Sequence, residues 1–170
     1  MLLWKTGIFL SHVSGRLANL PCFETEGGED VIKGKNAAIV YEDEYVMAFM
    51  DYAPVEDGHL LIVPKMHYTD INDIDEDDYL KVHKLAKKMS PVLLRALNAD
   101  GLNIGQNNGH CANQVVMHYH LHLIPRWCTS SPPSVSKQGR FARRPLTWER
   151  KIVDREELDA VAKLIRENLL

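Results

Sequence analysis

Three histidines at alternate positions are the residues of this chain best suited to chemistry. His118, His120 and His122 alternate with apolar residues within the segment 115–125, VVMHYHLHLIP. On an extended strand every second side chain points the same way, so the three imidazoles would share one face. A buried imidazole needs a partner for at least one ring nitrogen, which makes three adjacent rings poor core material. The spacing favours a functional site, although a polar strand face with satisfied rings stays open as the plain structural interpretation.

Two kinds of chemistry suit such a cluster. Same-face Cα atoms on a strand lie about 6.6–6.8 Å apart, so two of the rings could converge on one zinc ion with a third ligand from elsewhere. All three could do so only with strain, and no cysteine or carboxylate is near in sequence. Alternatively, a neutral imidazole attacks and leaves well near pH 7, which suits a covalent phosphoryl or nucleotidyl intermediate. From the residues alone both interpretations stay open.

The composition limits the classes of protein to consider. With 170 residues, 45% of them apolar and 25% charged, the chain can form one globular domain with a real core. The formal net charge of -3 argues against a stable nucleic-acid partner or a membrane-surface role, and no apolar run is long enough for a membrane span. The three cysteines, Cys22, Cys111 and Cys128, form neither a disulfide framework nor a CxxC site. We therefore expect a reducing compartment and a cytoplasmic protein.

The surrounding segments predict an α+β fold with a mostly antiparallel sheet. Five runs have strand-like patterning, the first two as a hairpin: 39–41, 46–49, 59–65, 102–108 and 115–125. A helix is predicted over 79–97, with the acid-rich stretch 70–78 capping its N-terminus and Pro91 kinking or splitting it. A final helix, 154–170, is predicted to begin at Asp154 with a capping-box-like arrangement.

Two stretches fall outside these elements. Residues 1–24 read as an N-terminal extension, either a short amphipathic helix or a weak transit peptide that would direct the chain to an organelle. Residues 25–170 read as a single domain. Within it, the Pro- and Ser-rich stretch 127–147 is expected to form a loop, and its cluster of basic residues at 137–144 could steer a polyphosphate or could simply be solvated.

The blocks around the histidines resemble the histidine triad superfamily. The run HYHLHLI at 118–124 matches the alternating His-φ-His-φ-His-φ-φ signature, where φ is apolar. A hairpin that ends in an acid, the block P-x-x-x-G-H-x-L-x-V-P-K-x-H at 54–67, and an Asn seven residues before a Gln are similar to further blocks of its nucleotide-binding branch. The similarity covers 37–126. It implies a five-stranded antiparallel sheet with one long helix and a C-terminal helix, and a homodimer formed through a sheet edge and a helix.

The resemblance also implies a reaction. The middle histidine, His120, would attack the α-phosphorus of a ribonucleotide derivative and form a nucleotidyl-histidine that water hydrolyses. The carbonyl of His118 would hold its second nitrogen, and His122 would contact the phosphate oxygens. His59 would be the fourth histidine of the site, and Asp51 would accept both ribose hydroxyls.

The remaining implied site residues contact the base and the phosphates. Met50 and Tyr52 would line the base pocket, while Asn107 and Gln114 would position phosphate and leaving group. The substrate would be a purine ribonucleotide or a dinucleotide, with neither metal nor other cofactor. The chain departs from the pattern at Val115, where hydrolases of the family usually carry a Ser or Thr hydroxyl.

Three functions follow as alternatives. The first is a nucleotide hydrolase or transferase of the phosphoramidase or dinucleoside polyphosphate hydrolase kind. The second is a nucleotide-binding or scaffolding protein with little turnover, which the missing hydroxyl at Val115 favours. The third is a metal-dependent hydrolase that uses the triad as ligands. A CxxC zinc site found in many relatives is not expected here, because Cys22 has no second cysteine beside it.

Overall fold

The computed structural model describes residues 37–128 and 149–169. The predictions made for the N-terminal extension 1–24, for the loop 127–147 from residue 129 onward and for its basic cluster at 137–144 lie outside these residues. In the described part of the chain, no helix is long and apolar enough to cross a membrane.

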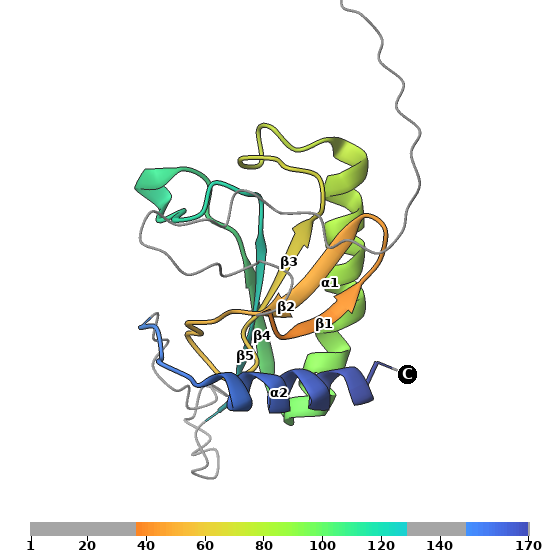
Figure 1. Ribbon diagram of the computed structural model, residues 1–170, viewed down its shortest axis with the longest axis vertical. Helices are drawn as coiled ribbons and strands as arrows, with labels where there is room; N and C mark the ends of the chain where they lie inside the picture. Colours follow the sequence, from red (N-terminus) through yellow and green to blue (C-terminus); the bar gives the residue numbers. More distant parts are fainter. Residues whose placement is uncertain (1–36, 129–148, 170) are drawn as a thin grey trace, which may run out of the picture.

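A five-stranded, wholly antiparallel sheet forms the centre of the molecule, as the sequence predicts. The strands lie in the order β1-β2-β3-β5-β4 (Figure 1). Their bounds are Ile39–Glu42 for β1, Val46–Met50 for β2, Leu60–Pro64 for β3, Gly101–Gly105 for β4 and Leu121–Arg126 for β5. The two α-helices are α1, Glu76–Leu97, and α2, Arg155–Glu167, and a short 3-10 helix covers His110–Ala112. The predicted α+β class and element order are confirmed.

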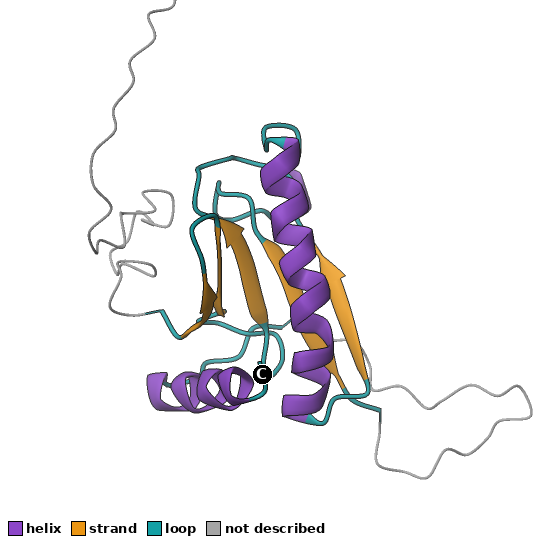
Figure 2. Cartoon of the chain, turned by 90° about the vertical axis from the view of Figure 1, so that its right-hand side faces the viewer, coloured by secondary structure: helices purple, strands orange, loops and turns teal. Residues whose placement is uncertain are grey.

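Helix α1 covers one face of the sheet, and α2 lies across one end of it (Figure 2). Asp75 caps α1, because its carboxylate accepts the backbone N–H of Asp77, and the predicted acidic helix start is thus confirmed. The helix is not split at Pro91, since Met89 on one side of the proline and Leu93 on the other are both fully buried against the sheet. Because residues on both sides of Pro91 pack against the sheet, the helix continues through the proline as one element.

The strands place different side chains on the two faces of the sheet. Under α1 lies the main core, which includes Ala48, Met50 and Leu60. On the opposite face a smaller cluster contains Phe49 and Leu61, with Met47 and Val63 beside them. Because side chains alternate between the two faces, only every second residue of a strand can point to a site on a given face.

The segment between β4 and β5 leaves the sheet earlier than the sequence predicts. Strand β4 ends at Gly105 and β5 begins at Leu121, so the predicted strands 102–108 and 115–125 are too long. The reason is local backbone conformation, because Gly109 and Asn113 have φ angles of 83° and 62°, which a strand does not accommodate. The residues between form a compact loop beside the histidines.

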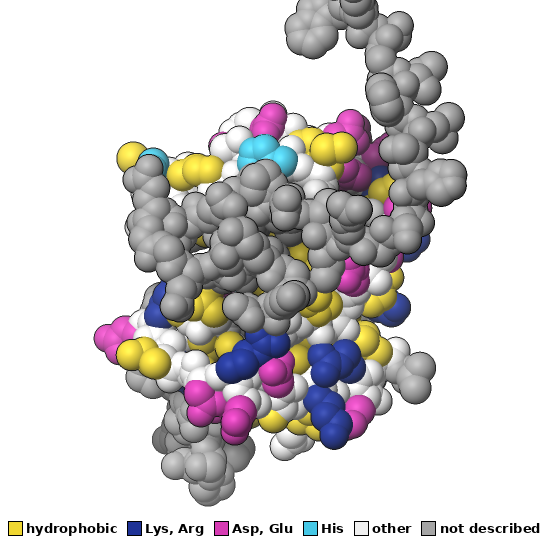
Figure 3. Space-filling model, in the orientation of Figure 1, with side chains coloured by type: hydrophobic (Ala, Val, Ile, Leu, Met, Phe, Trp, Pro, Cys, Tyr) yellow, Lys and Arg dark blue, Asp and Glu magenta, His cyan; other side chains and the backbone are white. Residues whose placement is uncertain are grey.

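Mixed charges cover the end of the molecule where α2 lies. Basic and acidic side chains are interspersed there (Figure 3), and two i,i+4 ion pairs, Arg155–Asp159 and Lys163–Glu167, follow the helix. Exposed ion pairs of this kind contribute little to the free energy of unfolding, so we expect these charged side chains mainly to interact with water.

Candidate active site

The ends of three strands bring the histidines together. His122 lies on β5 opposite Leu61 of β3, while His118 and His120 lie in the segment that leads into β5. His59 directly precedes β3. Asp51 directly follows β2, and its backbone N–H donates to the carbonyl of His59 at 3.0 Å. The predicted alternation holds even before β5 begins, because Tyr119, Leu121 and Leu123 all point into the core under α1.

A glycine makes the approach to His59 possible. Gly58 has a φ of +77°, a conformation that L side chains rarely adopt. A Cβ at this position would also collide with the side chain of Leu97 at the end of α1. The Gly-His pair of the block 54–67 thus has a physical basis: the glycine allows the tight turn that delivers His59 to the sheet.

The His120 ring is oriented by a backbone carbonyl. Its Nδ1 lies 2.7 Å from the carbonyl oxygen of His118. A carbonyl can only accept, so Nδ1 carries the proton and Nε2 carries the lone pair. The His120 ring is thereby set with its unprotonated nitrogen away from the anchor, the arrangement that a nucleophile requires.

His118 is a support for the site rather than part of its surface. Its side chain is fully buried, and Nε2 lies 2.9 Å from the carbonyl oxygen of Pro64, which fixes the proton on Nε2. Nδ1 then accepts from Nδ1 of His67 at 3.3 Å. His67, in the block 54–67, thus holds the first histidine from the side of β3.

A second chain of hydrogen bonds sets the proton of His122. The backbone N–H of Val55 donates to Nδ1 of His59 at 3.3 Å, so His59 carries its proton on Nε2. That nitrogen lies 2.9 Å from Nδ1 of His122 and donates to it. His122 therefore carries its own proton on Nε2, where it can act as a donor.

Burial keeps all four of these histidines neutral near pH 7. It lowers the pKa of His59 and of His118 to about 4 and that of His122 to about 3. The pKa of His120 is also lowered, chiefly by burial, while its bond to the His118 carbonyl opposes the shift. The positive charge of Arg150 contributes in the same direction as burial at His59, His120 and His122.

Asp51 is buried and has a cationic partner that sequence reasoning missed. Nη1 of Arg150 lies 3.1 Å from Oδ1 and 2.9 Å from Oδ2 of Asp51, and 2.8 Å from the carbonyl oxygen of Ala53. Nδ1 of His59 lies 3.4 Å from Oδ2. Arg150 is 99 positions from Asp51, and no local pattern marks it apart from its place shortly after a basic stretch.

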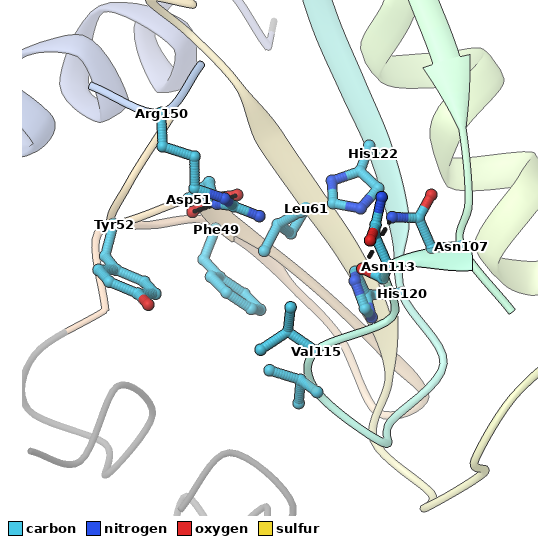
Figure 4. Close-up of a pocket in the computed structure, with 11 residues that line it drawn as sticks. Phe49, Asp51, Tyr52, Leu61, Asn107, Asn113, Val115, His120, His122 and Arg150 are labelled. Carbon is cyan, nitrogen blue, oxygen red and sulfur yellow. Dashed lines mark hydrogen bonds and ion pairs between the residues drawn. The ribbon is translucent and has the colours of Figure 1, made fainter. Parts of the chain in front are cut away.

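Two adjoining cavities open onto these groups. The first, of about 100 Å³, has Phe49, Asp51, Tyr52 and Leu61 in its wall. The second, of about 610 Å³, extends toward β4 along Asn103 and the residues that follow it. In Figure 4, Arg150, Asp51 and Tyr52 lie on one side, with His120, His122 and the two asparagines on the other. The residues shared by both cavities are Asn107, Asn113, Val115, His122 and Arg150.

The structure brings most of the predicted site residues to these cavities. Among the described residues that line them are His59, His120 and His122, together with Asp51, Tyr52 and Asn107. Val115, at the position of the missing hydroxyl, is largely exposed and lies in the wall of both. Asn107 is fixed by a bond from its Nδ2 to the carbonyl oxygen of Asn113 at 3.1 Å, and Asn113 is a lining residue that the sequence did not single out.

Two predicted residues lie elsewhere. Met50 is buried in the core under α1, and Phe49 lines the cavity instead because it lies two positions before Asp51 on the same face of β2. The Gln114 side chain is fully buried. Its Oε1 accepts the N–H of Gly109 at 2.6 Å, and its Nε2 donates to the carbonyl oxygen of Thr69 at 2.6 Å. Gln114 therefore shapes the loop behind the cavities.

The only set of potential metal ligands found among residues 37–128 and 149–169 overlaps the same site. Asp51, His59 and His122 offer ligand atoms that all lie within 4.8 Å of one another. The guanidinium of Arg150 already neutralises the carboxylate, and the two histidines are hydrogen-bonded to each other. A divalent cation would have to displace both interactions, so the arrangement fits proton-bearing imidazoles better than metal ligands.

Comparisons with known proteins agree with this geometry. A family model described as the HIT domain matches residues 33–128. An uncharacterized HIT-like protein of Saccharolobus solfataricus is 36% identical over 141 residues, which cover 82% of this chain and 94% of that protein. The adenosine 5′-monophosphoramidase HNT1 of Saccharomyces cerevisiae is 39% identical over 85 residues, 50% of this chain and 51% of the yeast enzyme.

A solved structure is similar over most of the described chain. The crystal structure of a hypothetical histidine triad nucleotide-binding protein from Sulfolobus tokodaii strain7 superposes with a TM-score of 0.63 and 33% identity. The match covers 78% of this chain and 83% of that chain. Together with the family match and the alternating histidines, this places the protein: it belongs to the HIT, or histidine triad, family.

Proposed function

We propose that this protein is a nucleotide hydrolase or transferase that cleaves a phosphoanhydride or phosphoramidate at the α-phosphate of a ribonucleotide derivative. The observation that carries the proposal is the bond of 2.7 Å between Nδ1 of His120 and the carbonyl oxygen of His118. It leaves a neutral imidazole whose Nε2 holds the lone pair, on a ring that lies in the wall of the first cavity. The similarity to a yeast phosphoramidase supports the same class of reaction.

In the first step, Nε2 of His120 attacks the α-phosphorus. A P–N bond forms between His120 and phosphorus, the leaving group departs with the electron pair of its own bond and, when it is an amine, with a proton from solvent, and the ring becomes positively charged. The His118 carbonyl stabilises this charge through the Nδ1 proton. His122 carries a proton on Nε2, and this N–H donates to the phosphoryl oxygens as negative charge develops on them.

In the second step, an acceptor attacks the nucleotidyl-His120 intermediate. When the acceptor is water, its oxygen bonds to phosphorus, its proton passes to solvent and the P–N bond breaks. A nucleoside monophosphate then leaves, with His120 returned to its neutral form. When a different hydroxyl reaches the phosphorus first, the same intermediate yields a transferase product. Both outcomes require the imidazole to be neutral at the start, and its lowered pKa provides this near pH 7.

The first cavity is proposed as the nucleoside subsite. Asp51 offers two carboxylate oxygens for the ribose hydroxyls. The rings of Tyr52 and Phe49, followed by Leu61 on the side toward the histidines, offer apolar surface for a purine base. The leaving group would then enter the second cavity beside Asn107 and the other polar side chains near β4. Val115 offers no hydroxyl to protonate or position it.

One experiment tests the chemical step. The full chain is mixed with adenosine phosphoramidate or diadenosine tetraphosphate, and the reaction is stopped within one turnover and examined by intact mass. We expect the mass to increase by one adenylyl group in the unmutated protein and in the control variant His110→Ala, which changes an exposed histidine of the 3-10 helix. The adduct should be absent in His120→Ala. Full turnover by His120→Ala would overturn the proposal.

Two other functions remain as outcomes of the same assays. Normal nucleotide affinity without turnover in the unmutated protein would favour a binding or scaffolding role, for which the missing hydroxyl at Val115 gives a reason. Activity lost on treatment with a chelator and restored by a divalent cation would favour a metal-dependent hydrolase built on Asp51, His59 and His122. Activity that survives the chelator would exclude that mechanism.

We further propose a homodimer as the working state of the protein. The chain mass is 19.4 kDa, so gel filtration should give roughly twice this value. An elution mass close to that of one chain would contradict the dimer.

A further inference from the structure

The two residues Arg150 and Lys151, which precede α2, are tied to the nucleoside side of the site. The backbone N–H of Lys151 donates to the carbonyl oxygen of Pro54 at 2.7 Å. Its ammonium group lies 2.6 Å from Oε1 of Glu56 and 2.7 Å from Oδ1 of Asp57. These bonds hold the neighbouring Arg150 over the carboxylate of Asp51. The backbone next to Arg150 is therefore fixed, while the Arg150 side chain itself is about half exposed.

The carboxylate of Asp51 has little capacity left for a ligand. Its Oδ1 accepts from the backbone N–H of Ala53 at 3.0 Å and from Nη1 of Arg150. Its Oδ2 accepts from the same nitrogen, and Nδ1 of His59, which carries no proton, lies 3.4 Å from Oδ2 without donating to it. Two ribose hydroxyls would need acceptor positions on both oxygens. At least one present partner must therefore move when a ribose binds.

Arg150 is the partner that can move. The Arg150 side chain is 48% exposed, whereas the other donor to Asp51, Ala53, contributes a backbone N–H. The guanidinium also lies in the wall of both cavities. Among the described residues that line them, Asp51 is the sole acid, so a displaced guanidinium would find no second carboxylate there.

We propose that Arg150 is a specificity-determining residue, which leaves Asp51 to the ribose and pairs with a phosphate group of the same ligand. The inference rests on the proposed function, because it assumes that Asp51 receives a ribose. A nucleoside without a phosphate has to break the ion pair between Asp51 and Arg150, and it offers the guanidinium no new anionic partner. A nucleotide replaces it, since a guanidinium binds phosphate oxygens as well as it binds a carboxylate. The site would thus take phosphorylated ligands and reject nucleosides.

Equilibrium binding to three stable ligands separates the two roles of Arg150. The ligands are adenosine, AMP and 2′,3′-dideoxyadenosine monophosphate, measured by calorimetry with the full chain. The affinity ratio of AMP to adenosine reports the gain from the phosphate, and the ratio of AMP to its dideoxy form reports the gain from the ribose hydroxyls. Neither ratio requires turnover, so a slow or inactive enzyme gives the same information.

Replacing the arginine should move the two ratios in opposite directions. In Arg150→Ala we expect the phosphate gain to fall about tenfold, because the guanidinium is lost, and the hydroxyl gain to rise by at least about threefold, because Asp51 is unmasked. Arg155→Ala is the matched control. It removes one positive charge at the start of α2, and Arg155 is not among the residues that line the cavities. Both ratios should stay unchanged in that variant.

The outcomes distinguish this inference from the proposed function. If the unmutated protein binds none of the three ligands, the proposed function fails and the inference fails with it. If AMP binds but Arg150→Ala changes neither ratio, or weakens all three ligands equally, only the inference is overturned and Arg150 is structural. A fall in both ratios would also overturn it, because Arg150 would then assist the ribose rather than compete with it.

Discussion

The two faces of the segment 118–123 have different tasks although they belong to the same few residues. On one face, Tyr119, Leu121 and Leu123 are buried in the core under α1. On the other, His118 and His120 are almost as deeply buried, yet each is fixed by a hydrogen bond to a backbone carbonyl. Close packing fixes the side chains of the apolar face. The side chains of the polar face are fixed by hydrogen bonds to backbone groups, whose positions the packing of the core determines.

This difference explains why a site of neutral imidazoles can exist inside a small domain. A buried ring with an unsatisfied nitrogen would be costly, but backbone groups of Pro64 and Val55 each fix one nitrogen of a histidine. Among the described residues, no buried side-chain nitrogen or oxygen lacks a partner. Backbone groups at the strand ends thus act as rigid hydrogen-bond acceptors and donors, and they determine which ring nitrogen of each histidine carries the proton.

The largest expected effect comes from the polar face. His120→Ala should reduce turnover by at least about 10³-fold, because the nucleophile is lost while the cavities keep their other walls. The thermal unfolding midpoint should change less than in a core variant. Turnover of diadenosine tetraphosphate and differential scanning calorimetry on the same samples test this. A variant that loses stability and activity in parallel would mean that the two faces are not separable.

Acid should disturb the polar face before the apolar one. The folded-state pKa values of His59, His118 and His122 lie well below the unfolded value of about 6.5. The unfolded chain therefore binds more protons between that value and about pH 4, and the free energy of unfolding should fall by several kcal/mol as the pH drops through this range. Urea unfolding at a series of pH values measures it. A flat profile between pH 6.5 and 4 would contradict neutral buried rings.

The apolar face should respond to truncation through stability. Met89 is fully buried in α1 against the sheet, so Met89→Ala should lower the free energy of unfolding by about 2–5 kcal/mol. Turnover per folded molecule should stay close to that of the unmutated protein, because Met89 lies on the side of the sheet away from the cavities. A tenfold loss of turnover at full folding would show that core packing also sets the histidine geometry.

The sequence predicts what repeats locally and misses what depends on distant contacts. The period of two correctly predicted that Tyr119 and its alternate neighbours face the core. The same period would have favoured Phe49 over Met50 in the cavity wall, had it been counted back from Asp51. The pairing of Asp51 with Arg150 has no local signal, since it joins the end of β2 to a segment 99 positions away.

The loop between β4 and β5 shows a second limit. The β-type residues before His118 continue the strand pattern, so the sequence predicts a strand that begins too early. The chain turns instead at Gly109 and Asn113, and Gln114 satisfies the backbone of the turn from inside. A glutamine that binds main-chain groups and one that binds a substrate look the same in sequence, because both are polar residues in a loop.

The smallest expected effect lies at the start of α1, far from the chemistry but on the face that supports it. The Asp75 carboxylate accepts the backbone N–H of Asp77 at 2.9 Å, so Asp75→Ala should lower the free energy of unfolding by about 1 kcal/mol. Asp75→Asn, which keeps a capping oxygen, should recover most of this loss, and urea unfolding of the two variants gives the comparison. Neither should alter the pH dependence of unfolding between pH 6.5 and 4, since that dependence comes from histidines held by Pro64 and Val55. A changed pH profile in Asp75→Ala would show that the helix start also tunes the histidines.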